Sequence, residues 1–505
     1  VLDVSITPNR ADCLSMIGIA REVAAITGKK IKIPTSEIQE STEDIKTITS
    51  VKIIDSDLCP RYTARMIKDV HIGPSPIWMK TRLEAVGLRS INNVVDVTNF
   101  VMLEMGQPLH SFDFRFLEEG RIVVRKSVQD EEFTSLDGKT RKLEAHTLLI
   151  CDGVKPVAIG GIMGGLNSEV KDDTQVVFLE SAYFNPSSIR RSARRLAMPT
   201  DAAFRFERGI DPEGVLAALN RAAQLIADLS GGKVCKNYID EYPAKVPAAA
   251  NIPLALSQVN AIIGTAIESA EVIRILQSIG MNVRETETGR YLVTPPTYRV
   301  DITREIDLIE EIARLYGYNR VPVTLPDVAV TEVVAIPRLN LEERIRAVLT
   351  GNGYNEVINY SFITPQSVDY LGLNENDERR RLVHIKNPLV EDQSIMRTTM
   401  IFALLDSLKR NANNGCFNLK LFEMGRIFLN CGAGKLPEER NVLAGILSGT
   451  IGEDLWNYRL NVDYYDIKGC LDNLFSDLKT ANCRYVAENP EPFLHPGKSA
   501  NIYLN

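Results

Sequence analysis

Two ionisable side chains in apolar surroundings, His110 and Glu180, are the first candidates for chemistry. His110, one of five histidines, lies in DVTNFVMLEMGQPLHSFDF beside Pro108, after a Gly-Gln turn. No serine, cysteine or aspartate stands at catalytic-motif spacing, so the pattern leaves His110 either structural or part of a pocket. Glu180 lies in FLESAYF, at a predicted strand end. Because burying an unpaired carboxylate is costly, Glu180 is either a hydrogen-bonded turn former or an acceptor for a ligand's hydroxyl or amine.

An acidic cluster occurs in RVDITREIDLIEEIARLYGY. Asp307, Glu310 and Glu311 are spaced i, i+3, i+4 and share one helical face, with Asp301 just upstream. Converging carboxylates suit a hard cation such as Mg²⁺. Acidic residues in the first turns of a helix are also favoured by the helix dipole, so a purely structural role stays open.

An arginine-rich stretch, SSIRRSARRLAMPTDAAFRFERGID, contrasts with the net charge of −7. Four of its arginines recur at i, i+1, i+4, i+5, which places them along one side of a helix: Arg190, Arg191, Arg194 and Arg195. A solvated helix face is one interpretation. The neighbouring Phe204 and Phe206 favour nucleic acid instead, because guanidinium groups hold phosphates and aromatic rings stack on bases.

The glycine-rich stretch AIGGIMGGLNSEV includes Gly164. A phosphate-binding loop of the Walker type requires Lys-Ser or Lys-Thr after its last glycine, and here Leu166 and Asn167 follow. The glycines therefore indicate close approach of the backbone, either to another strand or to a ligand.

The elements that must position these residues are strands and helices in alternation. Strand-like composition occurs at VKIID, RIVVRKS, HTLLICDG, VVFLESAYF, YLVTPP and NLKLFEMGRIFL. Helical periodicity occurs at CLSMIGIAREVAAITG, SPIWMKTRLEAVG, PEGVLAALNRAAQLIADLSGG, SAEVIRILQSIG, DLIEEIARLYGY and NLEERIRAVLTGNG. Proline-rich connectors are expected at 242–254 and 320–337. The pattern predicts an α+β protein of at least three domains.

The bulk composition excludes some classes. No run approaches 18 apolar residues, so no membrane span is expected. The eight cysteines are scattered without a C-x-x-C pair, which disfavours a zinc cluster or a disulfide framework and is typical of the reducing cytosol.

Several motifs together resemble one family. ITPNRADCLSMIGIAREVAA, INNVVDVTNFVMLEMGQPLHSFD, GGIMGG, LESAYFNP, PTDAAFRFERGIDP and DLIEEIARLYGYNRVP are similar to the β subunit of bacterial phenylalanyl-tRNA synthetase. The resemblance covers essentially the whole chain. It implies a fragment of a longer polypeptide, without the family's N-terminal tRNA-binding and C-terminal anticodon-binding domains.

The domains implied by the resemblance are four. They are an N-terminal remnant (1–50), a mixed tRNA-editing domain (51–240), a winged-helix-like domain with the acidic cluster (251–322), and a noncatalytic domain (338–505). The last is expected to have an antiparallel sheet like a class II synthetase core. Its MRTTM and LFEMGRIF resemble class II sequences, but the chain has no G-x-G-x-G-x-x-R nucleotide motif.

The function implied by the resemblance is shared with an α subunit, in an (αβ)₂ heterotetramer that binds tRNA in the cytoplasm. The α subunit would use ATP to attach phenylalanine to tRNA, while this chain would hydrolyse misacylated Tyr-tRNA. Glu180 would accept from the tyrosine hydroxyl and His110 would position the ester or a water. By resemblance the pocket wall also includes Thr98, Asn99, Pro108, Gly164, Thr200 and Ala202.

The remaining candidates also acquire roles by resemblance. The arginine face would hold the tRNA acceptor end, and Asp301, Asp307, Glu310 and Glu311 match the family's Mg²⁺ site. One alternative is a scaffold that binds tRNA and the α subunit with an inactive pocket. A second, a metal-dependent phosphoryl-transfer enzyme, is disfavoured because the chain has no phosphate motif near the acidic cluster.

Overall fold

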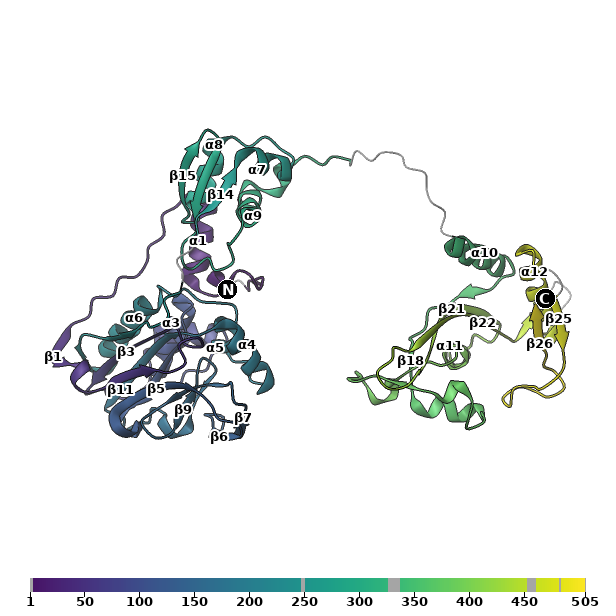
Figure 1. Ribbon diagram of the computed structural model, residues 1–505, viewed down its shortest axis with the longest axis horizontal. Coiled ribbons are helices and arrows are strands. Elements are labelled where there is room, and N and C mark those ends of the chain that lie inside the picture. The colour runs from purple at the N-terminus through teal and green to yellow at the C-terminus, as the bar shows by residue number, and fades with distance from the viewer. Residues whose placement is uncertain (1–2, 247–249, 326–336, 452–459, 481–482, 505) are drawn as a thin grey trace. The chain divides into compact units, whose positions relative to one another are not determined.

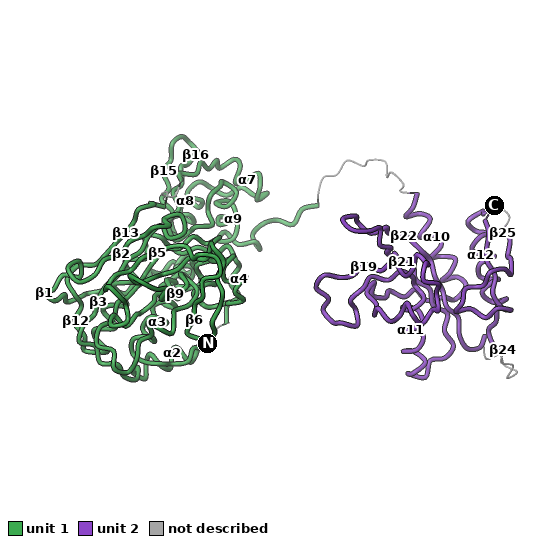
Figure 2. Tube along the Cα trace, turned by 60° about the horizontal axis from the view of Figure 1, so that its bottom comes forward, with its two compact units in different colours: residues 1–326 green, residues 327–505 purple. Residues whose placement is uncertain are grey.

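The structure is a computed structural model that describes residues 3–246, 250–325, 337–451, 460–480 and 483–504. The chain divides into two compact units, 1–326 and 327–505, which are described separately (Figure 2).

The first unit contains a six-stranded sheet with the order β1-β12-β3-β11-β4, in which β13 also pairs with β3. Figure 1 labels β1, β3 and β11 of this sheet. Its strands are β1 (Glu40–Asp44), β3 (Arg61–Lys68), β4 (Leu109–Asp113), β11 (Val176–Tyr183), β12 (Lys233–Lys236) and β13 (Ile239–Glu241). β11 lies between β3 and β4 and is antiparallel to both. The middle of this sheet therefore has its backbone hydrogen bonds satisfied on both sides.

A five-stranded sheet of the same unit has the order β10-β9-β8-β5-β2. Its strands are β2 (Ser50–Ile53), β5 (Arg121–Lys126), β8 (Leu148–Cys151), β9 (Pro156–Ile159) and β10 (Met163–Gly164). A separate hairpin is formed by β6 (Glu131–Thr134) and β7 (Thr140–Leu143).

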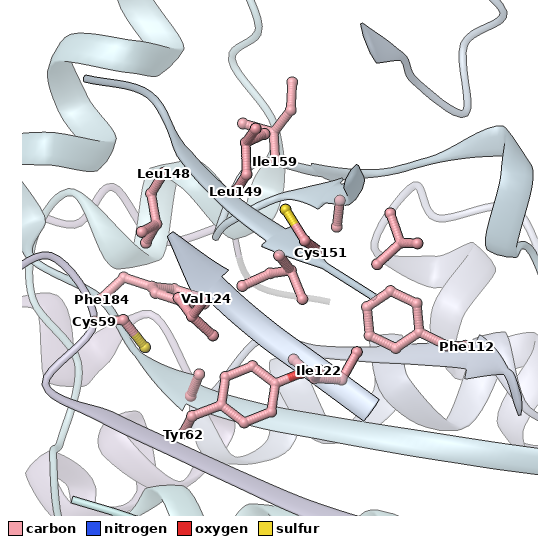
Figure 3. Packing of buried hydrophobic residues seen from close by; sticks show 14 of the residues in the cluster. Cys59, Tyr62, Phe112, Ile122, Val124, Leu148, Leu149, Cys151, Ile159 and Phe184 are labelled. Atoms are coloured by element: carbon pink, nitrogen blue, oxygen red, sulfur yellow. The ribbon is translucent and has the colours of Figure 1, made fainter. Parts of the chain in front are cut away.

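Two apolar cores flank β11 because its side chains alternate between the faces of the sheet. Phe178 and Ala182 belong to a core shared with the five-stranded sheet, where Tyr62, Phe112 and Val124 are also buried (Figure 3). The opposite face packs against helices in a second core. Glu180 has the same parity as Phe178 and Ala182, so the sheet directs its side chain toward the first core.

The helices of this region are α1 (Met16–Thr27), α2 (Ile77–Ala85), α3 (Val95–Met105), α4 (Pro186–Arg195), α5 (Asp201–Phe206) and α6 (Val215–Ser230). The Ser15 side chain accepts from the Gly18 amide at the start of α1, and Gly28 ends it in the left-handed conformation at φ 67°.

The remainder of the first unit is built from β14 (Ile252–Ala255), α7 (Leu256–Ile263), α8 (Ser269–Ser278), β15 (Asn282–Glu287), β16 (Arg290–Thr294) and α9 (Glu305–Tyr316). The three strands form an antiparallel sheet in the order β14-β16-β15. Leu308, Ile309 and Ile312 of α9 are buried in its core, as the helical periodicity predicts.

The second unit is built on two long antiparallel strands, β21 (Leu419–Leu429) and β22 (Glu438–Ser448). Its helices are α10 (Pro337–Gly351), α11 (Ile401–Asn413) and α12 (Tyr464–Asp477). Its short strands are β17 (Asn355–Glu356), β18 (Phe362–Ile363), β19 (Val383–His384), β20 (Ile395–Met396), β23 (Thr450–Ile451), β24 (Leu460–Asn461), β25 (Cys483–Val486) and β26 (Asn501–Leu504).

The mixed α+β, multidomain architecture is confirmed, and each strand and helix predicted above is present to within a few residues. All eight cysteines are free, which agrees with the absence of a disulfide framework. Among the described helices, none combines the length and hydropathy that a membrane crossing needs. The predicted connectors include residues 247–249 and 326–336, which lie outside the described residues.

Candidate active site

A pocket of about 70 Å³ lies where β4, β11, the β9–β10 turn and α5 meet. This volume has room for a few water molecules. Its lining is Pro108, Leu109, His110, Ile150, Ala158, Ile159, Gly160, Gly161, Ile162, Met163, Gly164, Glu180, Ala202 and Phe206. A larger cavity of about 1050 Å³ occurs in the second unit. Its basic lining residues, Lys409 and Arg410, are exposed to solvent, whereas the smaller pocket contains a buried acid and an imidazole.

Glu180 is the buried acid of this pocket, with 6% of its surface exposed. It stands directly opposite His110 on β4 and Ala64 on β3. The Tyr62 hydroxyl donates a 2.7 Å hydrogen bond to its Oε2. Burial raises the pKa of the Glu180 carboxyl to about 7, and the hydrogen bond from Tyr62 opposes that rise. Glu180 can therefore exist in both protonation states near neutral pH.

His110 presents its imidazole to the same pocket. Its ring packs edge-on against Phe112, with 4.4 Å between the ring centroids. Although part of the residue is accessible, the Nε2 atom is buried and has no hydrogen-bond partner in the part of the chain that the structure describes. Burial lowers the pKa of His110 to about 4. The ring is therefore neutral at physiological pH, and its Nε2 is available to a ligand or a water.

Gly164 makes room for that ring. A Cβ atom at this position would lie 2.4 Å from His110 Cε1 and 2.7 Å from Nε2. Gly164 belongs to the short strand β10, which is held against Ala158 of β9. The close backbone approach expected of the glycine-rich stretch therefore occurs at Gly164, where the neighbour is the His110 side chain.

The structure brings five of the eight predicted pocket residues together: Pro108, His110, Gly164, Glu180 and Ala202. Thr200 contacts the lining without being part of it. It caps α5, and its Oγ1 donates to the carbonyl of the lining residue Ile162 at 2.9 Å.

The other two predicted pocket residues, Thr98 and Asn99, lie on α3 and are not part of the lining. Thr98 is buried, and its hydroxyl donates to the Val95 carbonyl of its own helix at 2.7 Å. A role for these two residues at the pocket therefore remains a prediction from the resemblance.

Phe206 lines the pocket and Tyr62 lies behind Glu180, and the sequence does not predict either position. Tyr62 contacts Glu180 from β3, a strand that was not predicted. Phe206 was considered a base-stacking candidate, which is wrong because only 3% of it is exposed and its ring packs against Phe184 at 5.0 Å. Two residues that are two positions apart in a helix point to roughly opposite sides. The spacing of Phe204 and Phe206 in FRFE therefore indicates that one ring faces inward while the other faces out.

The arginine face has the predicted geometry. On α4, Ser188, Ile189, Ser192 and Ala193 are buried. The exposed side presents Arg190, Arg191, Arg194 and Arg195. Asn185 caps the helix and Pro186 occupies its first turn.

The arginines of this face differ in whether they form ion pairs. Arg195 forms an ion pair with Glu144, whereas Arg194 forms none with any described residue. Arg205, farther along the stretch, is buried and donates to the Asp201 side chain and the Leu14 carbonyl, so it does not belong to this face.

The four predicted metal ligands are not gathered around one point. No three of the carboxylates of Asp301, Asp307, Glu310 and Glu311 place their oxygens within 4.8 Å of one another. Glu311 is buried and accepts from Arg299 at 2.8 Å and Arg314 at 2.7 Å. Those arginines lower the pKa of the Glu311 carboxyl to about 2, although burial opposes them.

The other acids of this set make local contacts. Asp301 forms an ion pair with Arg299 at 2.9 Å. Asp307 accepts from the Arg304 backbone at 2.8 Å at the start of α9 and Glu310 is exposed. This arrangement fits the structural interpretation of the cluster better than a closed metal site.

One converging set of potential ligands occurs among the described residues, namely Asp12, Cys13 and Glu22. Arg10 fills its centre: its guanidinium bonds Asp12 at 2.9 Å, Cys13 at 3.1 Å and Glu22 at 2.5 Å. Glu22 also pairs with Arg314 of α9 at 2.6 Å. These contacts form an ionic network that joins the N-terminal segment to α9.

Three family models match successive parts of the chain. Residues 58–231 match the B3/4 domain, 252–318 the tRNA synthetase B5 domain, and 321–505 the phenylalanyl tRNA synthetase beta chain CLM domain. The pocket between the two sheets lies within the first match. Fold and matched domains together define a subunit of an aminoacyl-tRNA synthetase.

Curated relatives specify the family. The phenylalanine–tRNA ligase beta subunit of Syntrophus aciditrophicus (strain SB) is 58% identical over 100% of this chain and 63% of its own length. That of Geobacter metallireducens is 46% identical over 99% of this chain and 63% of its own length. The chain belongs to the phenylalanine–tRNA ligase β-subunit family, and it spans 63% of the length of these relatives.

A solved structure gives a weaker likeness. An N-terminal fragment of the phenylalanyl-tRNA synthetase beta-subunit from Pyrococcus horikoshii aligns with a TM-score of 0.33 and 17% identity, over 62% of this chain and 86% of that chain. A similarity of this size supports no argument about the site.

Proposed function

We propose that this chain serves in the attachment of phenylalanine to tRNA as the β part of phenylalanine–tRNA ligase, and that its pocket hydrolyses misacylated Tyr-tRNA. Its family membership supports the first part. The observation that supports the second is the direct pairing of His110 and Glu180 across β4 and β11, inside a buried pocket.

Fidelity explains why a phenylalanine enzyme needs a second site. A pocket selected for an apolar ring rejects an analogue that merely adds a hydroxyl by only about 10²-fold. Tyrosine is that analogue. A separate pocket that binds the misplaced hydroxyl and then cleaves the ester restores the missing discrimination.

Glu180 supplies the recognition in this proposal. Its ionised carboxylate accepts a hydrogen bond from the tyrosine hydroxyl. Phenylalanine offers no donor, so its entry leaves a buried charge without that partner, which is unfavourable. Because the pKa of Glu180 is about 7, the ionised fraction and therefore the discrimination increase as pH rises through neutrality.

His110 supplies positioning. Its unpartnered Nε2 holds a water or the ester end near the reacting carbon. The water oxygen bonds to the ester carbonyl carbon, the bond to the terminal tRNA oxygen breaks, that oxygen takes a proton, and free tyrosine leaves. A histidine with a pKa of about 4 is a weak base, so His110 is not assigned as the sole general base.

The partners are part of the same proposal. The α subunit would carry out the ATP-dependent attachment within an (αβ)₂ tetramer in the cytoplasm. The exposed arginine face of α4 would hold the tRNA acceptor end through its phosphates. Mg²⁺ at Asp301, Asp307, Glu310 and Glu311 remains a prediction. Isothermal titration of the assembled protein with Mg²⁺, compared with a Glu310→Gln variant, tests it.

The deciding experiment is a deacylation assay. The assembled synthetase is incubated with preformed Tyr-tRNA and Phe-tRNA, both on the phenylalanine tRNA, and ester loss is followed. Selective loss of the tyrosyl ester is expected. Equal, uncatalysed loss of both esters would contradict the editing function and favour a scaffold that binds tRNA and the α subunit.

A further inference from the structure

Tyr62 lies beside the acid that would recognise tyrosine. It is on β3, two residues from Ala64, which stands directly opposite Glu180. Alternation along β3 places Tyr62 on the same face as Ala64, so its ring reaches Glu180 diagonally across the strand pair. The hydroxyl donates to Glu180 Oε2 at 2.7 Å.

This hydroxyl has a restricted environment. Tyr62 is completely buried in the core between the two sheets (Figure 3). A buried tyrosine hydroxyl normally finds a hydrogen-bond partner, and here that partner is the one acid of the pocket lining. Among the described residues, Tyr62 is the only hydrogen-bond donor to the Glu180 carboxylate.

We propose that Tyr62 is a positioning residue for the editing reaction: its hydroxyl holds Oε2 of Glu180 and thereby presents Oε1, as an acceptor, to the hydroxyl of the bound tyrosine. This inference rests on the proposed function of the pocket. It assigns Tyr62 to specificity and not to bond cleavage, because Tyr62 contacts Glu180 and is not itself part of the pocket lining.

The bond also affects the charge of Glu180. A donated hydrogen bond stabilises the ionised carboxylate, so its loss raises the pKa of Glu180 beyond about 7. A protonated Glu180 can donate, and it no longer requires a donor from the ligand. Tyr62 therefore maintains the form of Glu180 that distinguishes tyrosine from phenylalanine.

The other ionisable groups near Glu180 are neutral and do not stabilise its ionised carboxylate in place of Tyr62. His110 on β4 is neutral at physiological pH because burial lowers its pKa. The buried Cys59 thiol, before the start of β3, has its pKa raised well above the usual value by burial and by Glu180, so it also stays neutral. The hydroxyl of Tyr62 is held protonated by the same causes, burial first and the charge of Glu180 second.

The test compares three forms of the assembled synthetase: the parent, Tyr62→Phe, and the matched control Tyr291→Phe. Tyr291 is also buried and hydrogen-bonded, to Ser269, but it lies on β16 away from the pocket. The ratio of Tyr-tRNA to Phe-tRNA hydrolysis is measured from about pH 6 to about pH 9.

The expected result for Tyr62→Phe is a pH midpoint of selectivity that moves up by at least about one pH unit. Selectivity at pH 7 should fall at least about fivefold, because the ionised fraction of Glu180 decreases from about one half to about one tenth or less. Tyr291→Phe should retain the parental midpoint. A parental midpoint in Tyr62→Phe would overturn the inference. If the parent itself does not hydrolyse Tyr-tRNA selectively, the proposed function fails instead, so the two failures are distinguishable.

Two further measurements exclude a merely structural effect. In a Glu180→Gln background the selectivity should lose its pH midpoint, and adding Tyr62→Phe should not restore or move one. Replacement of Tyr62 by 3-fluorotyrosine, which keeps the ring and has a more acidic hydroxyl, should move the midpoint down. This second replacement remains informative if Tyr62→Phe does not fold, and an unchanged or higher midpoint with it would contradict the inference.

Discussion

Replacing Glu180 by alanine tests the recognition step most directly. The change removes the acceptor for the tyrosine hydroxyl and also the charge that disfavours phenylalanine in the pocket. Hydrolysis of Tyr-tRNA should fall while hydrolysis of Phe-tRNA rises toward it, because both effects have the same origin. The pocket would then discriminate as poorly as the apolar pocket that selects phenylalanine, whose errors it is proposed to correct.

The magnitude follows from the one hydrogen bond that is lost. A bond to an ionised group contributes about 1.5–3 kcal/mol, which corresponds to a loss of roughly 10- to 150-fold in selectivity. The fold also loses stability, because the Tyr62 hydroxyl donates to Glu180 and would be left buried without an acceptor. That loss amounts to about 1–3 kcal/mol of unfolding free energy.

The assay is single-turnover deacylation of both esters by the assembled synthetase at about pH 8, where Glu180 is mostly ionised. Glu287→Ala is the matched control, since this glutamate is 76% exposed and lies on β15. Circular dichroism verifies that both variants are folded. A folded Glu180→Ala enzyme with the selectivity of the parent would refute the assignment of Glu180 as the residue that reads the hydroxyl.

Four further outcomes are expected. His110→Ala should slow Tyr-tRNA hydrolysis at least about tenfold without changing tRNA affinity, measured by filter binding, because a polar contact to the reacting end is lost. Gly164→Ala should slow it similarly, since the added methyl would overlap the His110 ring at 2.4 Å. Arg194→Ala should weaken tRNA binding and reduce the slope of log affinity against log salt by about 0.7–0.9. Glu180→Gln should remove a pH dependence of stability: burial raises this pKa, so its contribution is complete below about pH 4.5 and is lost as pH rises through about 7. Denaturant unfolding should therefore show that the unfolding free energy of Glu180→Gln rises relative to that of the parent between about pH 5 and pH 8.

Matched controls exist in the chain for these variants. His71→Ala removes an exposed imidazole, and Arg274→Ala removes an exposed guanidinium on α8. Gly73→Ala adds a methyl where no atom lies within 4 Å. If His110→Ala, Gly164→Ala or Arg194→Ala behaves like the parent, the functional role assigned to that residue is wrong. A parental pH slope in Glu180→Gln would show that another group titrates.

The fold could be predicted only where a strand or helix has a clear periodicity, and many of the shorter strands were not expected from the sequence. The exception that matters most is β3, the strand that holds Tyr62. Arg61, Thr63 and Arg65 interrupt its apolar pattern, yet all three are buried. Arg61 reaches Asp240 at 2.8 Å, and Arg65 reaches Glu40 at 2.9 Å, so tertiary ion pairs satisfy charges that the local sequence shows as exposed.

The site could be predicted only through the family resemblance. Nothing local in LESAYF or QPLHSFD indicates that Glu180 and His110 pair directly, because their strands are separated by more than 60 residues of sequence. The acidic cluster shows a different case: its helical spacing is as predicted, but two arginines of the same stretch, Arg299 and Arg314, bind Glu311. Spacing establishes which side chains share a face, and the partners that the fold brings to those side chains decide what they do.

The direct pairing of His110 with Glu180 limits how this chain can change in length. A single residue inserted within β4 or β11 would turn one of the two side chains to the other face of the sheet, where Val177 and Leu179 pack in an apolar core. An imidazole or a carboxylate would then be buried there without a partner. Insertions and deletions among related chains should therefore be absent from these two strands and concentrated in surface turns, such as the Gly138 turn between β6 and β7.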